Sequence, residues 1–351
     1  PKDQPLSMTV LLELGLQNYT KEIEDICVSA SKEYGLQIAM DKMEKEWEPM
    51  NFDTKEYRTS GTRILAGTDE IQMLLDDQIV KTQAMRGSRF IKPFLAQITR
   101  WEETLISMQD ILDNWMKMQS TWLYLEPIFS SDDIMRQMPT EGKMFRAVDN
   151  TWRVSMAQTF QQPSCVEVAR RPGFLDSLVE ANAKLDQIQK GLNDYLETKR
   201  LAFPRFFFLS NDELLEILAE TKDPLKVQPH LKKCFDGMAK LEFQTNMDIT
   251  ACFDPKGERL DFPYEKVNHK KINPNDSGGN VERWLIEVEI IMKKSLAYAI
   301  DFSMKDSMQS DRIEWLSRWQ GQVVICVNQT RWCVETEKTL LEGPTGRGLN
   351  G

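Results

Sequence analysis

Large apolar side chains recur every seven residues between Pro93 and Pro127. One position of this repeat holds four aromatic residues and a methionine: Phe94, Trp101, Met108, Trp115 and Trp122. Aliphatic residues lie between them: Ile98, Leu105 and Leu112. Steps of three and four residues bring such positions to one face of an α-helix, and Pro93 suits a first helical turn. The pattern predicts a bundle helix about 50 Å long with its tryptophans in the core. A tryptophan platform for a ligand or sugar is the weaker interpretation, and Gln119 interrupts the apolar face.

A second long helix is predicted over residues 178–195. Its apolar positions again follow at steps of three and four: Leu178, Ala181, Leu185, Ile188, Leu192 and Tyr195. Shorter amphipathic segments predict further helices: 21–47, 68–81, 212–219, 281–299 and 311–319. Glycine and proline separate these segments, and no fixed repeat of 20–50 residues indicates a repeat array. The chain is therefore predicted to be all-α, an elongated stack of helical bundles.

One stretch departs from the helical pattern. Residues 249–253 and 258–262 are strand-like, and they flank Asp254-Pro255-Lys256-Gly257, which has the residue preferences of a type I turn. We predict one small β-hairpin over 249–262. An isolated two-stranded hairpin is marginal in water, so we expect it to dock on another surface; a hairpin lying flat on its own helices is the alternative. The polar residues 263–280 after it are predicted to be a flexible connection.

Composition narrows the classes of function. The 351 residues suffice for about two domains, and 44 basic against 54 acidic residues give a net charge of −10, so nucleic acid is not an expected partner. Six cysteines without a CxxC pair favour a reducing compartment. The longest apolar run, 323–327, is too short to span a membrane, and no secretory signal is recognised. Because the chain starts at Pro1, it is expected to be a piece of something longer.

The search for chemistry predicts no catalytic, cofactor-binding or metal-binding residue. A GxxxxGK[ST] loop and a GxSxG elbow are absent. Gly346–Gly351 formally matches GxGxxG, but no strand precedes it, and a disordered tail is expected. His230 and His269 lack paired-ligand spacing, and His230 is expected to cap or pack. Carboxylates alternate with lysines as on solvated helix faces. A hydrolase built on scattered carboxylates is the least favoured hypothesis.

The segment 192–243 carries the most specific pattern. Pro204 disfavours a helical residue before it, so the long helix is expected to end near Arg200. The aromatic run 206–208 is expected to bury the connection. Ser210 stands three residues before Glu213 and ahead of an apolar run, which predicts a capping box at the next helix.

This segment resembles the N-terminal linker region of dynein heavy chains. The signature residues are Leu196, Glu197, Lys199, Arg200, Phe203, Pro204, Arg205, Phe206 and Phe208, followed by Glu213, Leu214, Leu215, Glu216 and Ile217. The resemblance extends through Trp47 and through residues 89–94, 122–126 and 319–324, so it covers nearly the whole chain. Residues 227–235 look more like axonemal than cytoplasmic heavy chains. Residues 343–351 depart from the family, in which helical linker sequence would continue.

The resemblance implies a mechanical linker, a lever that couples nucleotide-driven changes in a downstream AAA+ ring to the power stroke on a microtubule. Residues 1–200 would form a tail-proximal and N-terminal linker region, and residues 201–351 the linker subdomains. The implied partners are the AAA+ ring of the same heavy chain and other dynein subunits, with the microtubule reached only indirectly and no nucleic acid or membrane. ATP and Mg²⁺ would bind the ring, so this chain would not be an enzyme although its parent hydrolyses ATP.

The implied location is the cytoskeleton of the cytoplasm and, for the axonemal type, the cilium or flagellum. The resemblance also implies a helix at 323–327, where composition alone suggests a buried strand, and we predict a helix. The alternative function is a stand-alone helical scaffold related to the dynein linker but lacking a motor.

Overall fold

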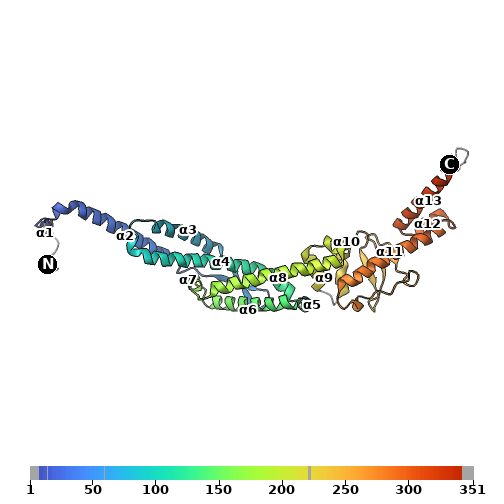
Figure 1. Ribbon diagram of the computed structural model, residues 1–351, viewed down its shortest axis with the longest axis horizontal. Coiled ribbons are helices and arrows are strands. Elements are labelled where there is room, and N and C mark those ends of the chain that lie inside the picture. The colour runs from blue at the N-terminus through green and yellow to red at the C-terminus, as the bar shows by residue number, and fades with distance from the viewer. Residues whose placement is uncertain (1–7, 14, 59, 220–222, 342–351) are drawn as a thin grey trace. The chain divides into compact units, whose positions relative to one another are not determined.

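The computed structural model describes residues 8–13, 15–58, 60–219 and 223–341 (Figure 1). The predicted tail with its GxGxxG match lies outside these residues. The chain forms two compact units, unit 1 of Pro1–Pro127 with Thr140–Gln189 and unit 2 of Ile128–Pro139 with Lys190–Gly351. The division into linker regions 1–200 and 201–351, which the resemblance implied, stays a prediction. Both units are mostly helical, which confirms the predicted fold class.

Unit 1 contains the first long helices and a small sheet. Its helices are α1 (Met8–Glu13), α2 (Thr20–Glu46), α3 (Asp69–Arg86), most of α4 (Leu95–Phe129) and of α6 (Pro139–Gln161), α7 (Cys165–Ala169) and residues 174–189 of α8 (Phe174–Ala202), with 3₁₀ turns η1 (Leu16–Tyr19) and η2 (Lys92–Phe94). The helix predicted from the seven-residue repeat is α4, and the helix predicted over 178–195 is α8. Both predictions are confirmed.

The tryptophans of α4 form the core of unit 1. Trp115 and Trp122 are fully buried and Trp101 almost so. Trp122 stacks on Trp152 of α6 with ring centroids 5.2 Å apart, and the Trp115 ring meets Phe174 edge-on at 5.0 Å. The interpretation as an exposed ligand platform is therefore wrong.

Unit 1 also holds a β-hairpin that the sequence did not predict. Strands β1 (Asp53–Tyr57) and β2 (Thr62–Ala66) pair antiparallel. Gln119 of α4 accepts a hydrogen bond from the Leu65 amide at 2.7 Å and donates one to the Leu65 carbonyl at 3.3 Å. The polar residue that interrupts the apolar face of α4 thus satisfies the backbone of β2, which would otherwise be buried without partners.

Unit 2 contains the remaining helices and a second sheet. The elements are α5 (Asp132–Gln137), η3 (Pro204–Phe208), α9 (Asn211–Ala219), η4 (Pro224–His230), α10 (Leu231–Cys234), β3 (Lys240–Phe243), β4 (Ile249–Phe253), β5 (Arg259–Asp261), η5 (Pro274–Ser277), α11 (Val281–Asp306), α12 (Arg312–Arg318) and α13 (Gly321–Leu341). Residues 323–327 lie in α13, so the predicted helix there is confirmed.

The predicted hairpin is two strands of a three-stranded antiparallel sheet in the order β3-β4-β5. Its body is core, because Ile249 and Ala251 are fully buried and Leu260 nearly so, and β5 packs on α11. The hairpin is therefore not a projecting docking element, although its tip at 255–257 is exposed. Asp254 shapes that tip, since its Oδ1 accepts from the amides of Lys256 at 2.8 Å and Glu258 at 2.7 Å.

Residues 263–280 bond to the sheet, which differs from the predicted flexible connection. The Ile249 amide donates to the Ile272 carbonyl at 3.0 Å, and the Tyr264 hydroxyl donates to the Ile249 carbonyl at 2.5 Å. The Asn273 side chain donates to the Asn246 carbonyl at 2.8 Å. The many Asn, Asp and Gly residues of segment 263–280 make turns, but the buried side chains of Tyr264 and Ile272 anchor those turns on β4.

Candidate functional site: the signature junction and the α11–α13 corner

The signature segment begins where α8 ends. Phe203 is extended, with φ −131° and ψ 94°, and Pro204 opens the 3₁₀ turn η3. The helix continues to Ala202, two residues beyond the expected end. Phe203 and Phe206 are buried against each other, with ring centroids 5.0 Å apart in an edge-to-face arrangement. This aromatic pair fixes the path of the chain out of α8.

Lys199 forms a buried ion pair with the first turn of α11. Its Nζ donates to Glu282 Oε1 at 2.6 Å, and both side chains are about 10% exposed. The ammonium also lies 5.5 Å from the centroid of the Tyr195 ring, and burial, followed by the charge of Glu282, raises the pKa of Tyr195. Glu282 Oε2 has no hydrogen-bond donor among the described residues. Among the described residues, Lys199 is the one cation that pairs with the Glu282 carboxylate, and the pair ties α8 to α11.

Arg205 makes a second bridge from η3 to α11. Its Nε lies 3.2 Å from Glu289 Oε2, and its Nη1 donates to the Cys234 carbonyl at 3.1 Å. Its guanidinium also covers the Phe235 ring at 4.8 Å. Partial burial pushes the pKa of Glu289 upward, but hydrogen bonds from Lys293 and Arg205 outweigh this, and the pKa lies below its usual value. The carboxylate is thus held in its charged form.

Arg200 fastens η3 to the end of α8. Its Nε donates to the Phe206 carbonyl at 3.4 Å, and its Nη2 donates to the Leu209 carbonyl at 3.1 Å and to Asn211 Oδ1 at 2.8 Å. These acceptors are uncharged, which distinguishes Arg200 from the other two signature cations. The contacts close the turn between α8 and α9.

The capping box predicted at α9 is confirmed. The Glu213 amide donates to Ser210 Oγ at 3.2 Å, and the Ser210 amide donates to Glu213 Oε2 at 3.0 Å. Lys233 adds an ion pair to the same carboxylate. The hydrogen bond from Lys233, and then that from the Ser210 backbone, lower the pKa of Glu213 to about 2.

The aromatic run of the signature is buried only in part, which differs from the expectation. The aromatic run 206–208 was predicted to bury the connection, and Phe206 is fully buried. Phe207 and Phe208 are instead 60% and 69% exposed. In a 3₁₀ turn of about three residues per turn, successive side chains point in different directions, so only one ring of the run faces the core.

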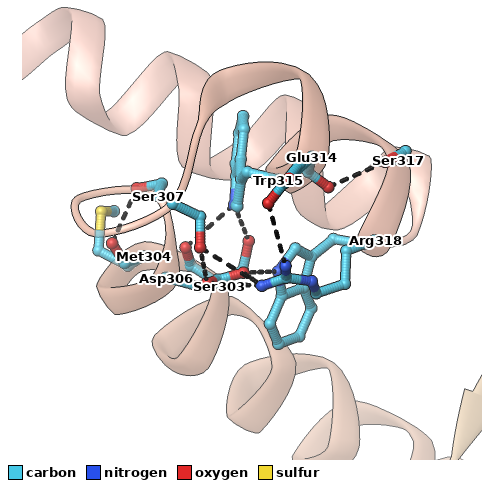
Figure 2. Close-up of polar contacts among 10 residues, drawn as sticks. Ser303, Met304, Asp306, Ser307, Glu314, Trp315, Ser317 and Arg318 are labelled. Atoms are coloured by element: carbon cyan, nitrogen blue, oxygen red, sulfur yellow. Dashed lines mark hydrogen bonds and ion pairs between the residues drawn. The ribbon is translucent and has the colours of Figure 1, made fainter.

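A second polar cluster joins the end of α11 to α12, at the corner that precedes α13 (Figure 2). Asp306, at the C-terminal end of α11, accepts from Arg318 Nη1 at 2.9 Å, Trp319 Nε1 at 2.7 Å and Ser310 Oγ at 2.5 Å. An anion is unfavourable at a helix C-terminus, so these donors are needed to keep it there. The bonds from Ser310 and Trp319, with Arg318, hold the pKa of Asp306 below its usual range.

Two further contacts fix the same corner. Trp315 of α12 is buried and points at Ser303, donating to its carbonyl at 3.1 Å and to its Oγ at 2.9 Å (Figure 2). Arg331 of α13 donates to the Ser307 carbonyl at 2.7 Å. The Ser303 carbonyl also accepts from the Ser307 amide at 2.8 Å, and Ser307 directly follows the last residue of α11. The two contacts therefore fix the chain where α11 ends.

The hairpin tip supplies the cap of α13. The Gly321 amide donates to both oxygens of Glu258, at 3.2 and 3.1 Å, and Gln320 Nε2 donates to the Arg259 carbonyl at 2.8 Å. A carboxylate at a helix N-terminus is stabilising because the amides there lack partners and carry partial positive charge. The hairpin therefore connects the sheet to α13, which the sequence did not reveal.

Unit 2 is expected to lose stability as the pH falls from about 4.5 to about 2. Glu213 has an ordinary pKa of 4.5 and a folded pKa of about 2. A folded pKa below the unfolded one stabilises the fold above the unfolded pKa, and this contribution disappears as the pH falls through the folded pKa. The measurement is thermal unfolding at pH 7, 4.5 and 2.5. Glu213→Gln should reduce the pH dependence, and an identical dependence in that variant would contradict the assignment.

The two histidines considered in the sequence analysis each lie beside a glutamate. His230 is buried, with its Nε2 3.5 Å from Glu216 Oε2, and it makes no side-chain cap. His269 Nε2 lies 3.1 Å from Glu287 Oε2. Within the described part of the chain, no group of three His, Cys, Asp or Glu residues could hold a metal ion. None of the described helices combines the length and the apolar composition of a membrane-spanning segment.

Comparison with known proteins agrees with the signature. The family profile described as "Dynein heavy chain, N-terminal region 2" matches residues 1–303. Dynein axonemal heavy chain 12 of Rattus norvegicus is 48% identical over 344 residues, 98% of this chain and 11% of that protein. Dynein axonemal heavy chain 3 of Homo sapiens is 49% identical over 332 residues, 95% of this chain and 8% of that protein. The chain belongs to the dynein heavy chain family.

A third relative, dynein axonemal heavy chain 1 of Homo sapiens, is 43% identical over 338 residues, 96% of this chain and 8% of that protein. All three relatives are axonemal, as residues 227–235 predicted. This dynein heavy chain segment spans 8–11% of their lengths.

Within the dynein segment, the structure gives most signature positions a role in packing or bonding. Leu196, Phe203 and Phe206 are core, while the three signature cations bridge elements. What the signature alone did not reveal is the identity of their partners, Glu282 and Glu289, since these lie more than 80 residues further along the chain. The only sequence signal for these partners was the series of acidic residues along α11. Such a series is equally typical of a helix face exposed to solvent.

Proposed function

We propose that this chain is the mechanical linker of an axonemal dynein heavy chain. It would act as a lever that couples nucleotide-driven changes in a downstream AAA+ ring to the power stroke in cilia and flagella. The observation that carries the proposal is the use made of Lys199, Arg200 and Arg205: each bonds one secondary-structure element to another. Charged side chains used in this way stiffen a joint, whereas catalytic ones converge on a substrate cleft.

The remaining features of the proposal follow from the family. ATP and Mg²⁺ would bind the ring and not this chain, so hydrolysis would belong to the parent protein. The partners would be the ring of the same heavy chain and other dynein subunits, with the microtubule reached through them. The location would be the axoneme.

The proposal is tested in the full-length heavy chain with Lys199→Met. Losing the bridge between α8 and α11 should slow microtubule gliding several-fold, while ATP is still hydrolysed. Lys190→Met is the matched control, because Lys190 is on the same helix and exposed, and it should glide at the normal speed. Normal gliding by the Lys199→Met motor would contradict a lever role for this joint. A parent transcript without a ring would favour the scaffold alternative.

A further inference from the structure

An apolar surface lies beside the signature junction. Leu201, at the end of α8, is 68% exposed, and Phe207 and Phe208 of η3 are 60% and 69% exposed. The 3.4 Å hydrogen bond from Arg200 to the Phe206 carbonyl brings the two segments side by side. We call these three residues the aromatic turn surface. Large apolar side chains that gather in water mark interaction sites.

The turn that carries the two rings is firmly held. The Phe206 amide donates to the Phe203 carbonyl at 3.0 Å, and the Leu209 amide donates to the Phe206 carbonyl at 3.1 Å. Arg200 bonds both the Phe206 and Leu209 carbonyls, and the capping box follows at Ser210. Because the backbone is already fixed, binding through these rings would lose little conformational freedom.

The aromatic turn surface has a positive charge beside it. Arg200 donates to two backbone carbonyls and to Asn211 Oδ1, and none of the described carboxylates forms an ion pair with it. Lys199 and Arg205, by contrast, are neutralised by Glu282 and Glu289. Aromatic and arginine side chains are enriched in protein interfaces relative to the rest of the surface, and a charge of this kind is complemented by a carboxylate.

We propose that the aromatic turn surface docks into an apolar socket with a carboxylate at its rim, on a segment of the same heavy chain outside residues 1–351. Assigning the socket to the heavy chain rests on the proposed function. It is supported by the length of the relatives, of which this chain spans only 8–11%. The chemistry of the socket rests on the two exposed rings and on Arg200.

The docking is tested by photo-crosslinking in the full-length heavy chain. Phe208 is replaced by p-benzoylphenylalanine, and the matched control carries the same replacement at Phe302. That control residue is 50% exposed, but its ring lies 5.1 Å from Tyr298 on its own helix. Position 208 should cross-link to one segment of the heavy chain containing Asp or Glu, with a yield several-fold above position 302. Equal yields, scattered products, or a segment without an acidic residue would overturn the proposal.

The charge is tested separately with Asn211→Asp. The new carboxylate would stand where Asn211 Oδ1 now lies, 2.8 Å from Arg200 Nη2, and would neutralise the guanidinium without changing the shape of the site. The cross-linking yield from position 208 should fall several-fold while thermal stability is not reduced. Asn328→Asp, on the exposed face of α13, adds the same charge elsewhere and should have no effect. An unchanged yield with Asn211→Asp would overturn the role of Arg200.

The identity of the cross-linked products also tests this inference independently of the proposed function. Cross-links to an accessory chain or to a second copy of the heavy chain would overturn the assignment of the socket to the same chain. The Lys199→Met gliding experiment does not depend on the socket, so either proposal can fail while the other stands.

Discussion

Replacing Trp115 by alanine is expected to lower the free energy of unfolding of unit 1 by about 3–5 kcal/mol. The side chain is fully buried, and the rings of Phe52 and Phe174 meet it edge-on at 5.4 and 5.0 Å. Truncation removes the burial of a large apolar surface and leaves a cavity that rigid long helices cannot close. Urea unfolding followed by circular dichroism measures the loss.

The matched control for this change is Trp332→Ala. Trp332 is 67% exposed on α13, so its removal should alter the free energy of unfolding by about 0.5 kcal/mol or less, as for surface changes generally. If Trp115→Ala unfolds at the same urea concentration as the unmodified chain, the tryptophan repeat of α4 does not form the core.

Replacing Lys199 by methionine is expected to lower the free energy of unfolding of unit 2 by about 3–5 kcal/mol, the usual cost of removing one partner of a buried pair. Glu282 would remain buried, and its Oε2 already lacks a donor among the described residues. The cost therefore comes from the stranded charge and not from lost apolar contact. Urea unfolding of the purified chain measures it.

The double variant Lys199→Met with Glu282→Leu separates these two causes. Apolar residues of similar volume often replace a buried ion pair at little cost, so the double variant should recover most of the stability lost in the single one. A double variant as unstable as Lys199→Met would show that packing around the lysine stem, and not the charge of Glu282, determines the stability of the joint.

The local features of the fold were predictable from the sequence. The repeat of Trp101, Trp115 and Trp122 specifies one helix face, because its period is that of the helix itself. The Ser210 and Glu213 capping box and the helix end before Pro204 depend only on neighbouring residues. Each of these features involves residues a few positions apart, so a short stretch of sequence is enough to predict it.

The features that were missed depend on residues far apart in the chain. Gln119 interrupts the apolar face of α4 because it bonds the backbone of Leu65, 54 residues earlier. Gln228 serves β3 in the same way, accepting from the Leu241 amide at 2.9 Å and donating to its carbonyl at 2.8 Å. The sequence showed the polar residues but not the strand edges that they cover.

The candidate site was predicted only in part for the same reason. The signature located Lys199, Arg200 and Arg205, but it did not specify which acceptors they reach. The exposure of Phe207 and Phe208 could not be predicted either, because three successive phenylalanines have no period from which an outward side can be inferred.

Energy transfer in the full-length heavy chain would show whether this segment moves as a lever. A donor fluorophore at residue 333, where Cys333 is exposed on α13, is paired with an acceptor on the AAA+ ring. The lever account predicts a reversible change in transfer efficiency on ATP binding, reduced in the Lys199→Met motor and retained in Lys190→Met. An efficiency that stays the same with and without ATP, in a motor that still moves microtubules, would contradict the account.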